Sequence, residues 1–150
     1  MAYNKSKAKG SSYEAKIAAL LTKELNMEFK RVPLSGAIAY LKGDIWVPSD
    51  TAAFEYTIEC KHYAEVNWNG LLTAKSSDLI SFWNQAVREA DVMKKLPLVI
   101  YKWNRSKDYV CWKDDIELES QIHYKGFGCD FKMGLLQDWL QVYKSLAKSK

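Results

Sequence analysis

Residues 43–61 read GDIWVPSDTAAFEYTIECK, and this stretch decides the fold that we expect. After Gly43 turns the chain, the apolar segment 44–47 predicts one strand and the alternating segment 54–61 predicts a second. Only a loop that begins at Pro48 separates the two segments. Two strands this close in sequence predict an antiparallel hairpin.

The second strand of this hairpin carries acidic and basic side chains on one face. Because side chains alternate between the faces of a strand, Glu59 and Lys61 point to the same side, and Cys60 points into the core. If Asp44 lies on the neighbouring strand, two carboxylates and one ammonium group converge. Such oxygen ligands suit Mg²⁺ or Mn²⁺, which would lower the pKa of a bound water and neutralise charge on a phosphate. A solvent-facing Glu-x-Lys is also common in ordinary strands, so the rest of the chain must support the metal-site interpretation.

Length and composition indicate one globular domain spanning residues 1–150. The chain is 48% hydrophobic and 27% charged, which is ordinary for a domain with a single core. Its formal charge of +4 is compatible with a phosphate-rich partner. Residues 1–10, with Lys7 and Lys9, read as a flexible basic arm. Such an arm is either a solvated tail or a contact to a nucleic-acid backbone.

Cysteine usage and hydropathy bear on the compartment. The three cysteines are odd in number and form no C-x-x-C pair, which indicates free thiols in a reducing compartment. The first ten residues lack the apolar segment of a signal peptide, and no window approaches the roughly 18 apolar residues of a membrane span. We therefore expect a cytoplasmic protein without a membrane partner.

Three helices are predicted from apolar residues at helical spacing. The first runs from Ser11 or Ser12 to about Asn26, and Ser-x-x-Glu at 11–14 matches a capping box in which Glu14 satisfies the helix start. The second runs from about residue 76 to Lys95. The third runs from Phe131 to about Ala147, with Asp130 as its cap.

Strands fill most of the remaining chain, at 29–32, 44–47, 54–61, 97–103, 109–113 and, more weakly, 122–125. The near-continuous apolarity of 97–103 indicates a central strand covered on both faces. Residues 62–75 read as a loop, in which Trp68 either packs against the body or stacks on a base. The order predicts an α/β or α+β fold, with a central mixed sheet flanked by helices.

Taken together, these pieces resemble the PD-(D/E)xK nuclease superfamily, and within it the archaeal-type Holliday junction resolvases and their phage relatives. The matching pieces run in family order from residue 9 to about residue 90: KGSSYE at 9–14, RVPLSGA at 31–37, GD at 43–44, ECK at 59–61 and Gln85 within FWNQAVREA. One departure is that Lys42-Gly43-Asp44 stands where some members have Pro-Asp. Another is the aromatic segment 62–75, which leaves the substrate details open.

The resemblance implies a restriction-endonuclease-like core and a role for each matching residue. Asp44, Glu59 and the Cys60 carbonyl would bind one or two Mg²⁺ ions, which Mn²⁺ may replace, and Glu14 would reach the metal directly or through water. Lys61 would hold or deprotonate the attacking water. Ser35 would contact the scissile phosphate, and Gln85 would orient Lys61 or a water. We further expect DNA contacts from Lys7, Lys9, Arg31 and Trp68.

The expected function is a Mg²⁺-dependent, structure-selective DNA endonuclease, namely a Holliday junction resolvase that cuts four-way DNA junctions as a homodimer, in the host cytoplasm if the chain is phage-encoded. A resolvase cuts two strands symmetrically, so a two-fold dimer is expected. Trp103, Trp112, Tyr124 and Trp139 either contribute to that dimer or belong to the core. The alternatives are a restriction-like or repair endonuclease acting on duplex, flap or nicked DNA, a non-catalytic DNA-binding module, and a globular protein whose Glu-x-Lys is accidental.

Overall fold

A single mixed sheet forms the centre of the computed structural model, which describes residues 2–33, 41–73 and 77–148, with side chains from Gly10 onward. Within this part of the chain the sheet has seven strands in the order β1-β2-β3-β4-β5-β7-β6. The strands are β1 (Lys30–Arg31), β2 (Ile45–Trp46), β3 (Tyr56–Tyr63), β4 (Leu96–Trp103), β5 (Tyr109–Trp112), β6 (Ile122–Gly126) and β7 (Cys129–Leu135). The helices are α1 (Ala2–Leu25), α2 (Trp68–Thr73), α3 (Asp78–Met93) and α4 (Leu136–Lys148). The predicted mixed sheet flanked by helices is confirmed.

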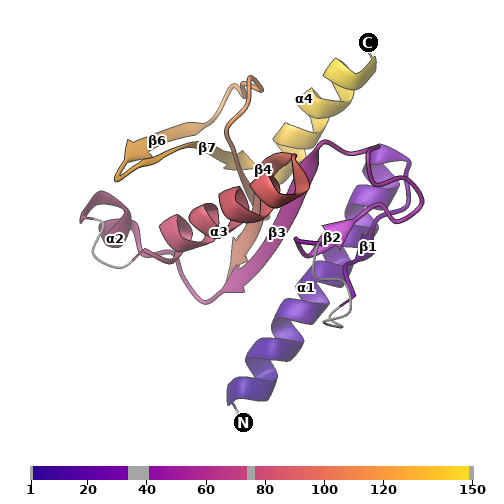
Figure 1. Cartoon of the computed structure of the whole chain (residues 1–150). Coiled ribbons are helices and arrows are strands. Elements are labelled where there is room, and N and C mark those ends of the chain that lie inside the picture. The colour runs from indigo at the N-terminus through magenta and orange to yellow at the C-terminus, as the bar shows by residue number, and fades with distance from the viewer. Residues whose placement is uncertain (1, 34–40, 74–76, 149–150) are drawn as a thin grey trace.

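Helices cover both faces of the sheet, so the molecule has three layers. Figure 1 shows α3 crossing in front of the sheet, with α1 and α4 on the other side. Residues of α1 and α4, among them Ile17, Leu21 and Trp139, pack against one face. Residues of α3, among them Leu79 and Trp83, pack against the opposite face. The two faces of β3 therefore lie in different environments.

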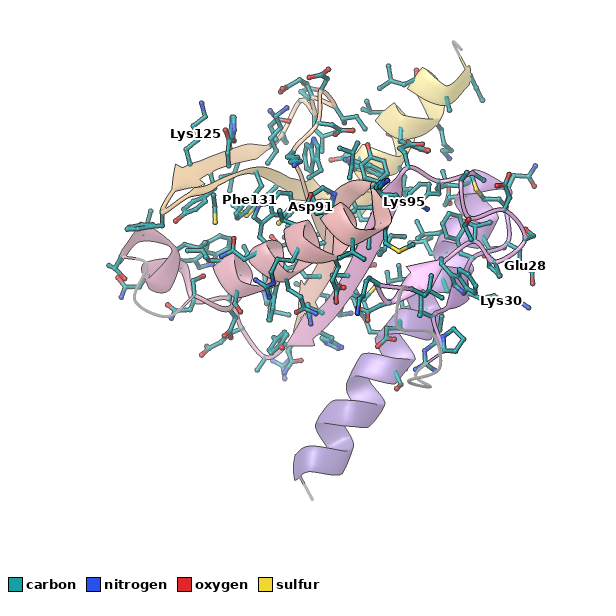
Figure 2. The ribbon with its side chains drawn as sticks, viewed as in Figure 1. Glu28, Lys30, Asp91, Lys95, Lys125 and Phe131 are labelled. Atoms are coloured by element: carbon teal, nitrogen blue, oxygen red, sulfur yellow. The ribbon has the colours of Figure 1, made fainter. Side chains whose placement is uncertain are left out.

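The hairpin predicted from residues 43–61 is present. β2 pairs with β3 in antiparallel register, with Ile45 opposite Ile58. Phe54, Tyr56, Ile58 and Cys60 belong to the cluster under α1 and α4, as the alternation of the sequence predicts. Lys95, just after α3, donates hydrogen bonds to the main-chain oxygens of Thr51 and Phe54 and so ties the hairpin loop to the end of that helix (Figure 2).

β4 is the central strand, as its apolar sequence predicts. It pairs in parallel with β3, from Tyr56 opposite Leu96 to Tyr63 opposite Trp103, and in antiparallel with β5. Leu98, Val99 and Ile100 are fully buried, alternately against α1 and α4 and against α3. A parallel pair needs a long crossover, and here α3 makes the connection. This crossover places α3 over the face of β3 that carries Glu59.

The predicted helix from Phe131 to Ala147 is wrong in its first part, because residues 129–135 form strand β7. Phe127 and Gly128 both have positive φ angles, which is the geometry of a tight two-residue hairpin turn between β6 and β7. Phe131, which is labelled in Figure 2, and Met133 alternate onto the face under α3. The ring centroids of Phe131 and Trp83 are 4.9 Å apart. β7 pairs on both sides, with β5 and β6, and this tertiary pairing outweighs the helical spacing. Asp130 pairs with His123 and caps no helix.

Two further expectations also need correction. α1 begins at Ala2, so residues 2–10 continue the helix where a flexible basic arm was expected, and Ser11–Glu14 cannot be a capping box because they lie inside the helix. Residues 62–73 do not form a continuous loop, because β3 extends to Tyr63 and the short helix α2 follows. The Asn67 side chain accepts the Gly70 N–H at 2.8 Å, which starts α2 in a segment without apolar periodicity.

Gly43 gives a stability test of the hairpin. Its φ is +95°, and a Cβ there would lie 3.0 Å from a Thr57 methyl group and 3.1 Å from the Ile58 carbonyl oxygen. Gly43→Ala should therefore lower the free energy of unfolding by about 1–3 kcal/mol, measured by urea denaturation. Gly10→Ala is the matched control, because a Cβ at this helical position meets nothing within 4 Å. The control substitution should leave the free energy of unfolding unchanged or raise it slightly. If the two variants have the same free energy of unfolding, an alanine at position 43 is not strained.

Candidate active site

The Asp44 carboxylate is fixed at the junction of β2 and β3. The Asp44 N–H donates to the Ile58 carbonyl at 2.7 Å, and its carbonyl accepts the Val32 N–H at 2.8 Å. Its side chain turns towards β3, where Oδ2 accepts the Cys60 N–H at 2.7 Å. Main-chain bonds to two neighbouring segments thus hold this carboxylate beside the Glu59–Lys61 segment.

Glu59 and Lys61 lie on the face of β3 that α3 covers. Glu59 is only 2% exposed although its side chain is polar, and the Lys61 Nζ lies 3.9 Å from its carboxyl group. In the parallel register, Glu59 lies opposite Val99 and Lys61 opposite Tyr101, and both partners belong to the cluster under α3. The predicted placement of Glu59 and Lys61 on one side is therefore confirmed.

Gln85 of α3 connects these two side chains. Its amide Oε1 accepts a hydrogen bond from Lys61 Nζ at 3.4 Å, and its Nε2 donates to the Glu59 carboxylate at 3.4 Å. One turn earlier on α3, the ring of Phe82 lies under the Lys61 ammonium, 5.1 Å from ring centroid to Nζ. The α3 side chains thus orient Lys61 by one polar and one aromatic contact.

Glu14 approaches the site from α1 together with Arg31 of β1. The Arg31 Nε donates to the Glu14 carboxylate at 3.5 Å, and its second guanidinium nitrogen donates to the Ser11 hydroxyl at 3.2 Å. These contacts hold Glu14 beside the hairpin, where its charge interacts with those of Asp44 and Lys61. Arg31, expected as a DNA contact, is engaged with α1 in this structure.

Burial and like charge raise several carboxylate pKa values here. Burial raises the pKa of Asp44, against the opposing effects of the Cys60 N–H and Lys61. The pKa of Glu14 is raised by burial and then by the negative charge of Asp44, with Arg31 opposing. Burial also raises the pKa of the Cys60 thiol well above its usual range, so its side chain is an inert apolar group.

Glu89 and Phe82 also lie at this site, although their roles were not predicted from the sequence. Glu89 lies one turn after Gln85 on α3, and burial and the charge of Asp44 raise its pKa. Its Oε2 is buried and has no hydrogen-bond partner among the described residues. The spacings of three residues from Phe82 to Gln85 and four from Gln85 to Glu89 place all three on one helix face, a signal that the sequence does contain.

The donor set suits a hard divalent cation, but the described side chains do not complete a coordination shell. No group of three or more His, Cys, Asp or Glu side chains in this part of the chain is placed to hold a metal ion. Asp44 and Glu59 supply carboxylates, and the partly buried carboxyl groups of Glu14 and Glu89 lie close enough to interact with the charge of Asp44. Mg²⁺ commonly takes one or two carboxylates and keeps several waters, so two carboxylates and a main-chain carbonyl fit its needs. Glu14 as a direct ligand stays a prediction.

The remaining residues that were predicted to contact DNA or to form a dimer lie outside this cluster or outside the described part of the chain. Ser35 lies outside the described residues, as do the side chains of Lys7 and Lys9. Trp68 lies on α2 and is 46% exposed, with its ring edge-on to that of Trp103 at 6.3 Å. Trp112, Tyr124 and Trp139 are buried within the described chain, so these three belong to the core.

The model of the "Phage putative PDDEXK endonuclease" family matches residues 5–137, which is most of the chain. The chain belongs to this family. Membership indicates a nuclease and confirms the resemblance to PD-(D/E)xK nucleases, which generally use divalent metal ions.

Two individual proteins are also similar. Protein D14 of Escherichia phage T5 is 27% identical over 146 residues, covering 90% of this chain and 91% of that protein. The structure of Archaeoglobus fulgidus Hjc, a Holliday junction resolvase, covers 87% of this chain and 91% of its own at 17% identity and a TM-score of 0.44. Among the described residues, no helix is long and apolar enough to cross a membrane.

The raised carboxylate pKa values predict how stability depends on pH. Because the folded state holds the Asp44 proton more tightly than the unfolded state, the free energy of unfolding falls as pH rises from about 4 through the raised pKa. Asp44→Asn removes this loss and should be more stable than the wild type at pH 7 in EDTA. Urea denaturation from pH 4 to pH 8 measures both profiles.

The matched control for this measurement is Asp115→Asn, which changes an exposed carboxylate distant from the site. Its stability profile should follow that of the wild type. If Asp44→Asn also follows the wild type, burial does not penalise the Asp44 charge.

Proposed function

We propose that this protein is a Mg²⁺-dependent, structure-selective DNA endonuclease that cuts four-way junctions. The observation that carries the proposal is the convergence of Asp44, Glu59 and Lys61 at the β2–β3 hairpin, with Glu59 buried as a carboxylate. Family membership supports the nuclease chemistry. The junction is the finer part of the proposal, and Mn²⁺ would replace Mg²⁺ in the same oxygen-ligand site.

Asp44, Glu59 and the Cys60 carbonyl are the groups that would hold the metal. Asp44 has one carboxylate oxygen engaged by the Cys60 N–H, which leaves Oδ1 as a ligand. When bound, Mg²⁺ neutralises charge on the phosphate and makes a coordinated water more acidic. Glu14 and Glu89 add negative charge around this position, which favours a cation without requiring that either carboxylate bind it directly.

Lys61 is the group that would act on the attacking water. Its side chain is 21% exposed, so a water and a phosphate can approach Lys61 from one side while α3 covers the other. Gln85 and Phe82 hold the Lys61 chain, so Nζ needs little rearrangement before it donates to the water or to the developing phosphate charge. In this scheme Gln85 is a positioning residue, because it acts through Lys61 and Glu59.

The catalytic assignment is tested by three substitutions. Asp44→Asn, Glu59→Gln and Lys61→Ala should each lower Mg²⁺-dependent cleavage of a four-way junction by at least about a hundredfold, because each removes a charged group that acts in the transition state. Cleavage is measured with labelled strands on denaturing gels, and DNA binding is measured separately by anisotropy in Ca²⁺. Circular dichroism checks the fold.

Glu65→Gln is the matched control, because it neutralises an exposed carboxylate just beyond β3. This variant should cleave at the wild-type rate. Full activity in any one of the three site variants would remove that residue from the mechanism, and full activity in all three would overturn the assignment of the site.

Substrate choice needs its own experiment. A four-way junction and a linear duplex of the same sequence should differ in cleavage rate by at least about tenfold if the enzyme selects structure. Symmetric cutting also requires two sites, so light scattering at micromolar concentration should give the mass of a dimer. Equal cleavage of both DNAs by a monomer would favour a restriction-like or repair endonuclease acting on duplex, flap or nicked DNA.

A further inference from the structure

An aromatic groove lies on the same face of the sheet as Lys61. Its volume is about 710 Å³, and its lining includes Trp68, Tyr101, Trp103, Tyr109, Ile122 and Met133. The sheet register connects it to the candidate active site, because Tyr101 lies opposite Lys61 on β3 and opposite Tyr109 on β5. Since adjacent strands are about 4.8 Å apart, the β5 side of the groove lies roughly 10 Å from β3.

The rings in this groove present flat surfaces of the kind that nucleobases stack on. Trp103 and Tyr109 are stacked, with centroids 4.6 Å apart and planes at 16°. Trp68 stands edge-on to Trp103 at 87° and is 46% exposed, and Ile122 at the other side is 56% exposed. Base–aromatic stacking is tolerant of sequence, because every base has a π-face.

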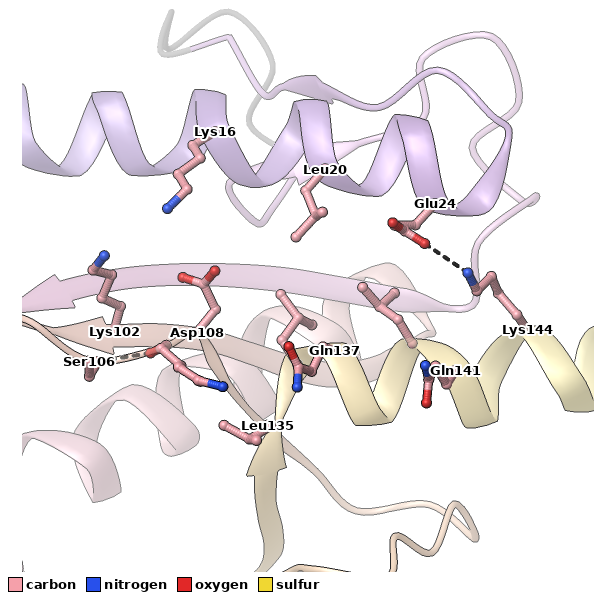
Figure 3. Close-up of a pocket in the computed structure, with 13 residues that line it drawn as sticks. Lys16, Leu20, Glu24, Lys102, Ser106, Asp108, Leu135, Gln137, Gln141 and Lys144 are labelled. Carbon is pink, nitrogen blue, oxygen red and sulfur yellow. Dashed lines mark hydrogen bonds and ion pairs between the residues drawn. The ribbon is translucent and has the colours of Figure 1, made fainter.

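A lysine pocket lies on the opposite side of the β4–β5 turn. This pocket of about 460 Å³ lies between α1 and α4, and its charged lining residues are Lys16, Lys102, Lys107, Lys144, Glu24 and Asp108 (Figure 3). Both acids are already engaged, since Glu24 pairs with Lys144 at 2.7 Å and Asp108 accepts the Tyr13 hydroxyl at 2.9 Å. Four lysines against two acids give the pocket a net positive charge, which suits phosphate.

The β4–β5 turn joins the two surfaces. Trp103 and Tyr109 at its ends line the groove, whereas Lys102 and Lys107 line the lysine pocket. Ser106 fixes the turn, because its hydroxyl accepts the Trp103 N–H at 3.1 Å and donates to the Trp103 carbonyl at 2.9 Å. A stacking surface and a phosphate-binding surface thus meet across one turn of fixed shape.

We propose that an unpaired DNA strand crosses the β4–β5 turn, with a base stacked on Trp103 and Tyr109 and its phosphates against Lys102 and Lys107. A paired strand does not fit this description, because its bases already stack within the duplex. Glu119 places one carboxylate among the groove residues. Because a carboxylate repels phosphate, the phosphates are expected to lie against the lysine pocket. This inference rests on the proposed function for its DNA substrate, and it assigns recognition of unpaired nucleotides to a surface beside the cleavage site.

The test compares two oligonucleotides of about 12 residues, one of thymidines and one of abasic sugars, bound in EDTA and measured by anisotropy. The wild type should bind the thymidine strand at least about fivefold more tightly, and Trp103→Ala or Trp68→Ala should reduce that ratio towards one. Lys107→Ala should weaken both strands equally and lower the salt-dependence slope by about 0.7. Phe127→Ala is the matched control, because its ring is 60% exposed and lies outside the groove.

The results separate this inference from the proposed function. If the wild type cleaves a linear or branched duplex but binds the thymidine and abasic strands equally, the inference is overturned and the proposed function stands. If the wild type prefers the thymidine strand but shows no Mg²⁺-dependent cleavage, the nuclease assignment is overturned and the inference stands. If Trp103→Ala fails to fold, the test is made with Trp68→Ala. A folded Trp68→Ala variant that keeps the wild-type ratio of thymidine-strand to abasic-strand affinity would contradict binding in the groove. A wild-type dimer that Trp68→Ala dissociates, with no oligonucleotide effect, would assign the groove to a second copy and also overturn the inference.

Discussion

The hydrogen bond from the Cys60 N–H to the Asp44 carboxylate, at 2.7 Å, is the contact on which the candidate site depends. It sets the side chain of one hairpin strand against the main chain of the next. The positions of Glu59 and Lys61 depend on the same strand, because these residues flank Cys60. Ile58 and Cys60 pack into the core, so Glu59 and Lys61 must point to the opposite face. Gly43 makes the contact reachable, since its positive φ turns the chain immediately before Asp44.

This arrangement concentrates negative charge where the protein can least solvate it. Burial raises the pKa values of Asp44, Glu14 and Glu89, and the negative charge of Asp44 raises those of Glu14 and Glu89 further, so each carboxylate opposes folding when ionised. Arg31 and Lys61 offset part of the charge, and the remaining stability must come from the apolar layers on the two faces of the sheet. Destabilised charge of this kind is typical of functional sites, and the proposed Mg²⁺ would relieve it.

The sequence predicted what depends on local alternation and missed what depends on distant pairing. Alternation along β3 placed Glu59 and Lys61 on one side and Cys60 in the core, and the apolar run of β4 identified the central strand. β7 was taken for the start of a helix, because Met133 and Leu136 also fit helical spacing and only pairing with β5 and β6 selects the strand. Glu89 was missed for a related reason, since its importance comes from Asp44, which is 45 residues away in sequence.

The distribution of charge explains how an acidic site can belong to a DNA-cutting protein with a net charge of +4. Clustered carboxylates repel a phosphate backbone, so they can engage DNA only with a cation between them and with basic groups elsewhere that supply the attraction. The lysine pocket between α1 and α4 is such a basic surface, and it lies on the opposite side of the sheet from Glu59. A straight duplex cannot easily contact both sides of a sheet at once, whereas a strand that leaves the duplex can pass from one to the other. The separation of acidic and basic groups therefore supports the proposal that the substrate is DNA that branches or unpairs near the point of cleavage.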